Sequence, residues 1–206
     1  MIPAHEALER LRTGNARFVS GTLSLETLAS RMQRGAAMAT QSPFAVILGC
    51  SDSRAPVEII FDQGPGDLFV IRVAGNIVAP SQIGSVEFAA ERFGTRLVVV
   101  LGHTGCGAIE ATLEVLESRG QPTSRHLDSI VDRIRPSVQA LIETDLRKDH
   151  KALFHAAVRA NVRVAANQLR HGSRVLERLI EGDGLVVIGA EYSLQTGQVD
   201  FFDGVP

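Results

Sequence analysis

Two cysteines lie far apart in this chain, and each belongs to a short run of residues that suits a metal ion. Cys50 begins the run CSDSR, and Cys106 ends the run HTGC, which His103 begins. Thiolates and imidazole are ligand types that zinc prefers, and the two runs supply two sulfurs and one ring nitrogen. Three protein ligands leave zinc a fourth position for water, as in catalytic sites. The sequence therefore predicts a zinc site at Cys50, His103 and Cys106, with one ion per subunit.

Asp52 has two alternative roles beside such an ion. It could be the fourth ligand and close the site, or it could pair with Arg54, which is two residues away and needs only a local turn to reach it. Water on an open zinc site loses a proton near neutral pH and becomes a nucleophile. A structural zinc with four permanent ligands is a further alternative, but such a site has no need of a competing arginine. The chain has no Cys-x-x-Cys, which disfavours a redox pair.

The two metal-binding runs follow apolar segments that have the pattern of β-strands buried on both faces. The sites of open parallel sheets form beyond the carboxyl ends of the strands, so two neighbouring strands could bring both runs to one point. Cys106 is expected where a turn becomes a helix, which favours its thiolate. The predicted strands cover residues 44–49, 67–73, 96–102 and 185–190, with a short edge strand at 199–202.

Helical patterns lie between and around these strands. They cover residues 6–19, 25–38, 83–93 and 107–118, and a stretch from 124 to 180 with expected breaks at Pro136 and Gly172–Ser173. Strands that alternate with helices predict the α/β class, with a central, mainly parallel sheet of four strands plus the edge strand, flanked by helices. The extra helices need a surface to pack on, and a partner subunit offers one. We expect a single domain over 1–206, with an N-terminal helical arm (1–40) and an α/β core (41–206) that contains a helical insert at about 124–181.

The bulk properties of the 206-residue chain exclude several classes of function. The formal net charge is −2, which gives no electrostatic case for binding nucleic acid or an anionic membrane. No apolar run approaches the roughly 18 to 20 residues that span a bilayer, and the first residues lack the pattern of a signal peptide. Two cysteines do not make a disulfide framework, and thiols kept for metal favour a reducing compartment. A cytoplasmic location is therefore expected.

Several segments together resemble the β-class carbonic anhydrases of the bacterial type. The resemblance covers nearly the whole chain and rests on residues 11–18, 49–54, 62–69, 74–76, 102–108 and 189–192. It implies the reversible hydration of carbon dioxide to bicarbonate and a proton by zinc-bound hydroxide, with zinc held by Cys50, His103 and Cys106.

The resemblance also implies roles for residues around the metal. Asp52 and Arg54 would form a dyad that gates the fourth zinc position: in the active form Arg54 holds Asp52 away from zinc, and in the closed form Asp52 ligates it. The remaining implied positions contact the substrate: Gln41 through a hydrogen bond, Phe69 and Ala74 as the apolar wall, and Gly107 as a backbone donor. Loop capping is the plain alternative for Gln41, and core packing is the plain alternative for Phe69 and Ala74.

Members of this family build the pocket between two subunits, and their N-terminal helices wrap the partner, which implies a homodimer or tetramer. Some members have an inhibitory bicarbonate site made of a tryptophan, an arginine and a tyrosine. Arg72 and Tyr192 match the last two positions, but Ile47 stands in the first, and the chain has no tryptophan. The proton shuttle is not identified, and the candidates by residue type are His126, His150, His155 and His171.

Two other functions are compatible with the same ligands. A relative on the same scaffold could hydrolyse carbon disulfide or carbonyl sulfide, and the residues that bind its zinc would be identical. A zinc-binding module without turnover would instead hold four ligands and no exchangeable water.

Overall fold

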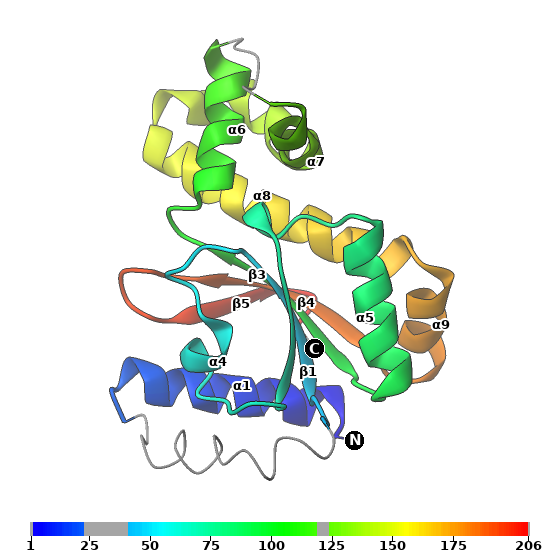
Figure 1. The fold of residues 1–206 in the computed structure, drawn as a ribbon. Helices are drawn as coiled ribbons and strands as arrows, with labels where there is room; N and C mark the ends of the chain where they lie inside the picture. The colour runs from blue at the N-terminus through cyan, green and yellow to red at the C-terminus, as the bar shows by residue number, and fades with distance from the viewer. Residues whose placement is uncertain (1, 23–40, 119–123, 206) are drawn as a thin grey trace.

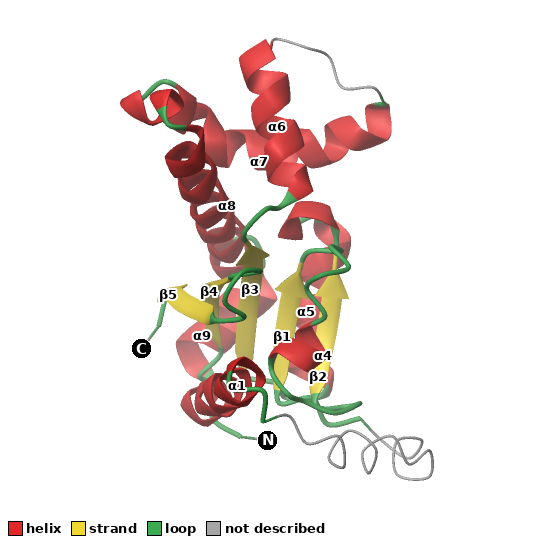
Figure 2. Cartoon of the chain, turned by 90° about the vertical axis from the view of Figure 1, so that its left-hand side faces the viewer, coloured by secondary structure: helices red, strands yellow, loops and turns green. Residues whose placement is uncertain are grey.

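The computed structural model describes residues 2–22, 41–118 and 124–205. At its centre is a five-stranded sheet (Figure 1). The order of its strands is β2-β1-β3-β4-β5, as the labels of Figure 2 show. The strands β1 to β4 are parallel, and β5 pairs antiparallel with β4. This confirms the predicted α/β class with four parallel strands and one edge strand. Their bounds are β1 (Ala45–Gly49), β2 (Leu68–Arg72), β3 (Leu97–His103), β4 (Val186–Tyr192) and β5 (Val199–Asp203).

The two central strands, β1 and β3, are the ones that lead into the predicted metal ligands. Every residue of both strands is buried, which explains why their sequences are apolar without alternation. The strands pair in register with Gly49 opposite Leu101, so they end at the same edge of the sheet. The chain leaves β1 toward β2 on one side and β3 toward β4 on the other. The order of the strands therefore reverses between β1 and β3, which is where α/β folds form their sites.

One face of the sheet is covered by α1 (Ala4–Val19) and the short α4 (Val57–Ile60), as Figures 1 and 2 show. Ala7, Leu8 and Leu11 place the apolar stripe of α1 in a core cluster with Ile47 of β1. The described N-terminal helix thus packs on its own chain. The packing of N-terminal helices on a partner subunit stays a prediction, and the second predicted arm helix, at 25–38, lies outside the described residues.

The other face is covered by α5 (Pro80–Arg92), α8 (His150–His171) and α9 (Arg174–Gly182). Val162 of α8 lies against two glycines of the sheet: a Cβ built on Gly102 or Gly189 would come within 2.6 or 2.7 Å of its methyl groups. The absent side chains of these glycines therefore set how closely α8 approaches β3 and β4.

A third apolar cluster lies beyond the carboxyl ends of the strands, where Figure 2 shows α6 (Gly107–Ser118) and α7 (Arg125–Ile142). It contains both cysteines together with side chains of α6, α7 and α8. Two single-turn helices border it, η1 (Ala74–Asn76) and η2 (Asp145–Lys148). The metal-binding runs therefore lie between the end of the sheet and a layer of helices.

The predicted break at Pro136 is wrong, because α7 continues through this residue. Proline removes one intrahelical hydrogen bond, at a cost of about 3 kcal/mol. Val131, Ile134 and Val138 are buried on both sides of it, so packing holds the helix together. The helix α7 ends only at Ile142. The next long helix, α8, begins after Asp149, which caps it by accepting a hydrogen bond from the backbone N–H of Ala152. The break at Gly172–Ser173 is confirmed, since Ser173 caps α9.

The region that the sequence assigns to an insert is helical from α7 to α9 within its described part. The division into arm, core and insert stays a prediction. None of the helices in the described ranges is long and apolar enough to cross a membrane.

Candidate metal centre

The structure brings the three predicted ligands together. Cys50 directly follows β1, His103 is the last residue of β3, and Cys106 directly precedes α6. Their ligand atoms all lie within 4.8 Å of one another. The side chains are buried, with relative exposures of 7% for Cys50 and 1% for His103 and Cys106. The sheet register that aligns β1 with β3 is what makes residues 53 positions apart converge.

The ring of His103 is oriented for coordination through one nitrogen. Its Nδ1 lies 2.9 Å from the carbonyl oxygen of Thr104, which fixes that nitrogen as the N–H donor. Its Nε2 is buried and has no hydrogen-bond partner among the described residues. A buried imidazole nitrogen without a partner is costly unless something binds it, and a metal ion does so.

The thiols of Cys50 and Cys106 contact each other, and each changes the pKa of the other. The hydrogen bond with Cys106 is the main cause that lowers the pKa of Cys50, helped by the backbone N–H of Gly75, whose nitrogen lies 3.3 Å from Sγ. The same contact with Cys50, together with burial, raises the pKa of Cys106. This outweighs the lowering by the backbone N–H groups of Ile109 and Ala108, so the expectation that the helix start favours the Cys106 thiolate is not met by these groups alone. Two neighbouring thiolates are favourable only with a cation between them, so this donor pair suits a divalent metal.

Arg72 holds the loop that carries the first ligand. Its Nε donates to the carbonyl oxygen of Cys50 at 2.9 Å, and its Nη2 donates to that of Asp52 at 2.5 Å. This arginine lies at the end of β2 and pairs in register with Gly49 of β1. The strand β2 therefore helps to position the CSDSR run, which follows β1.

Cys50, His103 and Cys106 are called the cluster below. Asp52 lies at its rim and pairs with Arg54. The guanidinium donates from Nε to Oδ1 at 2.9 Å and from Nη2 to Oδ2 at 2.7 Å. These hydrogen bonds hold the pKa of Asp52 well below its usual range, and the carboxylate in turn raises the pKa of Arg54. Oδ2 of Asp52 is 3.9 Å from Nε2 of His103. The carboxylate is thus close to the cluster while both of its oxygens are engaged by Arg54.

Two of the four predicted substrate contacts lie beside the cluster. Ala74 directly precedes Gly75, which contacts Cys50, and Gly107 directly follows Cys106 at the start of α6. Ala74 is therefore one residue from a hydrogen-bond donor to Cys50, and Gly107 is one residue from Cys106.

The other two predicted contacts lie elsewhere in the same chain. Gln41 is exposed and precedes β1, whose far end carries Cys50, so a strand of roughly 16 Å separates them. Phe69 pairs in register with Val46, four residues before the cysteine. Its ring packs near those of Phe88 and Phe93, with centroids 6.2 and 6.1 Å away.

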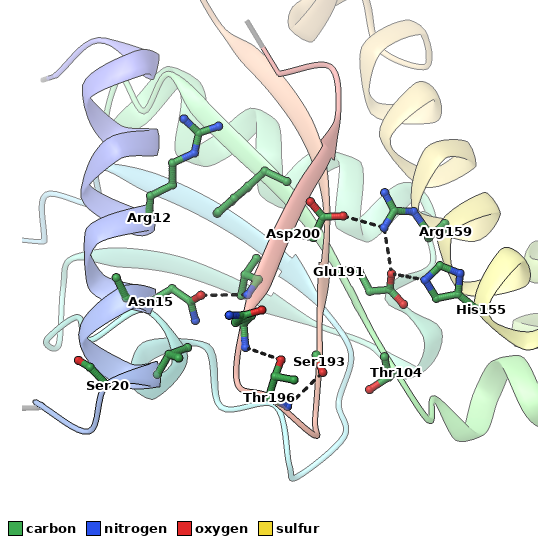
Figure 3. Close-up of a pocket in the computed structure, with 15 residues that line it drawn as sticks. Arg12, Asn15, Ser20, Thr104, His155, Arg159, Glu191, Ser193, Thr196 and Asp200 are labelled. Carbon is green, nitrogen blue, oxygen red and sulfur yellow. Dashed lines mark hydrogen bonds and ion pairs between the residues drawn. The ribbon is translucent and has the colours of Figure 1, made fainter. Parts of the chain in front are cut away.

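A cavity of about 930 Å³ lies between α1, α8 and the β4–β5 hairpin, and Figure 3 shows its lining. Thr104 lines it, but none of the three metal ligands does. His155 and Arg159 of α8 point toward Glu191, with the closest contacts at 3.4 and 3.3 Å. The three residues that could hold a metal ion lie outside this lining, so the cavity and the metal-ligand cluster are separate features of the fold.

The four histidines considered as proton shuttles are all exposed. His155 lines the cavity just described, and Nε2 of His150 lies 3.1 Å from Oε1 of Glu110.

The three positions compared with the inhibitory bicarbonate site have other contacts here. Arg72 is engaged by the loop carbonyls, Ile47 is fully buried, and Tyr192 is buried near Phe18 with ring centroids 6.5 Å apart. Arg72 and Tyr192 end β2 and β4, which are separated in the sheet by β1 and β3.

Sequence reasoning missed three residues that support the cluster: Gly75, Arg72 in its role on the loop, and Asn161. The amide of Asn161 donates to the carbonyl oxygen of Gly75 at 2.8 Å. A signal was available, because Asn161 lies four residues from Ala157 and Ala165 on the buried face of α8. A polar residue within such an apolar stripe indicates a specific hydrogen bond.

The fold and this donor set together form a possible metal site at the carboxyl edge of an α/β sheet. Residues 45–199 match the family model for carbonic anhydrase. The chain is 37% identical over 195 residues to a carbonic anhydrase of Mycolicibacterium smegmatis, covering 94% of this chain and 91% of the relative. It is 35% identical over 199 residues to carbonic anhydrase 2 of Mycobacterium tuberculosis, covering 97% and 93%.

The fold is also that of solved β-carbonic anhydrases. A tetrameric β-carbonic anhydrase of Sordaria macrospora matches with a TM-score of 0.73 and 24% identity, over 82% of this chain and 84% of that one. The chain therefore belongs to the carbonic anhydrase family, in its β class.

Proposed function

We propose that the protein catalyses the zinc-dependent, reversible hydration of carbon dioxide to bicarbonate and a proton. The observation that carries this proposal is the convergence of Cys50, His103 and Cys106 within 4.8 Å, with an aspartate at the rim held by an arginine. Membership of the family supports the same reaction.

The residues present fit a zinc ion. A tetrahedral ion with bonds of about 2.0 to 2.3 Å holds its ligands roughly 3.5 to 4 Å apart, which the observed spacing accommodates. Nε2 of His103, which has no hydrogen-bond partner among the described residues, and the thiols of Cys50 and Cys106 would supply the three ligands. When bound, zinc acts as a Lewis acid that makes water a nucleophile near neutral pH.

Asp52 and Arg54 form the dyad of the proposed mechanism. With Arg54 on both of its oxygens, Asp52 stays ionised and away from the three ligands, and can accept a hydrogen bond from a group placed at the rim. If the pair separates, the carboxylate is free to move toward the cluster and become a fourth ligand. Arg54 thereby controls access to the fourth position.

The substrate pocket is proposed to need a second copy of the chain. Ala74 and Gly107 lie beside the cluster of their own chain, whereas Gln41 and Phe69 lie toward the opposite end of β1. If these two residues contact carbon dioxide, they do so at the cluster of a neighbouring subunit. This supports a homodimer as the smallest active unit, and a tetramer built from such dimers is compatible with it.

A substrate comparison tests the proposal. The zinc-loaded protein is assayed with carbon dioxide, carbonyl sulfide and carbon disulfide under the same conditions, with the zinc-stripped protein as control. We expect zinc-dependent turnover of carbon dioxide. Turnover of only the sulfur compounds would assign the protein to hydrolysis on the same scaffold, and no zinc-dependent turnover of any of the three would support a module without catalysis.

A further inference from the structure

A continuous pair of hydrogen bonds links the helix α8 to the first metal ligand. The side-chain amide of Asn161 donates to the carbonyl oxygen of Gly75 at 2.8 Å, and the backbone N–H of Gly75 donates to Sγ of Cys50 at 3.3 Å. Both bonds are buried. Asn161 is 86 residues from Gly75 in sequence and 111 from Cys50, so only the folded packing of α8 on the sheet brings them together.

Gly75 takes part in both hydrogen bonds, as acceptor from Asn161 and as donor to Cys50. It has φ +69° and ψ 19°, a left-handed conformation inside the η1 turn that glycine adopts without strain. A Cβ on this residue would lie 2.8 Å from Cδ1 of Ile134 and 3.1 Å from Cβ of Ala108. The turn is therefore packed under α6 and α7 and can direct its N–H toward the sulfur only while its backbone keeps this conformation.

Asn161 is placed to fix that conformation. Its side chain is buried, with 3% exposure, and its donor meets the carbonyl of the same residue whose N–H contacts the thiolate. The neighbouring Val158 and Val162 are also buried, so α8 has little freedom to shift along the sheet. Without the amide, the Gly75 carbonyl would lose the hydrogen bond that holds the turn in place.

We propose that Asn161 is a positioning residue for the zinc site, acting through Gly75 on the Cys50 thiolate. The inference rests on the proposed zinc site and extends it, since it concerns how tightly the first ligand is held. Partners in the shell around metal ligands fix the ligand geometry, and their loss typically lowers metal affinity about 10- to 100-fold. The helix α8 would thus contribute to metal retention without supplying a ligand.

The test compares Asn161→Ala with Thr95→Ala in the full chain. Thr95 is buried, with 2% exposure, and donates from Oγ1 to the carbonyl oxygen of Pro43 at 2.8 Å, before β3 and at the opposite end of the strand from His103. The measurements are the rate of zinc release to a chelator, the sulfur-to-metal charge-transfer absorption of the cobalt-substituted protein, and the melting temperature.

We expect both variants to lower the melting temperature, but only Asn161→Ala to speed zinc release, by about tenfold or more, and to shift the cobalt absorption. Unchanged release and an unchanged cobalt spectrum would overturn the proposal, as would equal acceleration in both variants. If Asn161→Ala does not fold, Asn161→Asp is used with the same readouts, since it keeps the side-chain shape but loses the amide donor. A wild-type protein that binds no zinc or cobalt would refute the proposed metal site itself, and the positioning role with it.

Discussion

Arg54 engages both carboxylate oxygens of Asp52 and also donates from Nη2 to the carbonyl oxygen of Gly105 at 3.0 Å. Gly105 lies between the second and third metal ligands, so one guanidinium connects the two runs that converge on the cluster. The side chain of the aspartate is 15% exposed and that of the arginine 58% exposed, so the pair lies near the surface and not within the core. Arg54 is therefore the residue whose removal most directly changes the dyad without removing a metal ligand.

We expect Arg54→Ala to retain zinc and to lose about 100-fold or more in the rate of carbon dioxide hydration. Without the guanidinium, Asp52 is free to move onto the metal, and misplaced groups at a reacting centre cost about this much. Zinc content and stopped-flow hydration are measured on the same sample. Arg54→Lys is the control, because it keeps the charge but cannot form the two-pronged pair. We expect a rate between those of the wild type and the alanine variant, and normal rates in both variants would refute the dyad.

We expect Cys106→Ser to lose zinc and activity together. A serine oxygen is a weaker zinc ligand than a thiolate, and Cys106 supplies one of the two sulfurs. Metal analysis gives the zinc content. X-ray absorption at the zinc edge then counts the sulfur ligands, with two expected in the wild type. Full occupancy and normal turnover in the variant would remove Cys106 from the site.

The titration of Tyr192 gives a test of the fold at high pH. Burial raises the pKa of Tyr192, so its neutral form stabilises the folded state below the ordinary tyrosine pKa of about 10, and this contribution is lost as the pH rises through the higher folded value. Tyr192 is the only tyrosine and the chain has no tryptophan, so tyrosinate absorbance reports this residue alone. We expect the absorbance to rise only above pH 10, together with loss of structure by circular dichroism. A reversible titration at or below pH 10 in the folded protein would contradict the burial of its ring.

The close approach of α8 to β3 predicts the effect of Gly102→Ala. The new methyl group would lie 2.6 Å from Cγ2 of Val162, and overpacking of this kind costs about 1 to 3 kcal/mol. Urea unfolding measures the free energy, and Val162→Ala in the same chain should recover part of the loss because it makes room. Gly84→Ala is the control, since a Cβ there meets nothing within 4 Å, and we expect it to be neutral or to stabilise α5 by about 0.5 to 1 kcal/mol. Strictly additive effects of the Gly102 and Val162 substitutions would contradict the contact.

The parts of the fold that were predictable from the sequence are those with a simple period or a strong local signal. The unbroken apolar runs of β1 and β3 predict buried parallel strands, and the structure brings the predicted ligands at their ends together as a possible metal site. The turn at Gly172–Ser173 was recognisable because a glycine precedes a capping serine. In each case the signal in the sequence is local, although the strand pairing that joins the two runs is not.

The interactions that sequence reasoning missed are those that tertiary packing decides. Pro136 carries the local signal of a helix break, but buried side chains on both sides of it keep α7 continuous. Asn161 and Arg72 support Cys50 although they are 111 and 22 residues away from it in sequence. No local sequence pattern predicts which backbone carbonyl groups their side chains will bind. Local sequence also does not show that Gln41 is far from the metal ligands of its own chain. The two are separated because Gln41 precedes β1 and Cys50 follows it.

Stopped-flow hydration of carbon dioxide by zinc-stripped protein that is reloaded in steps tests the central claim most directly. If Cys50, His103 and Cys106 hold the catalytic zinc, the rate should be near the uncatalysed background without metal. It should then rise in proportion to bound zinc and level off at one ion per chain. A rate that is independent of zinc, or a fully loaded protein that remains at the background rate, would contradict the account.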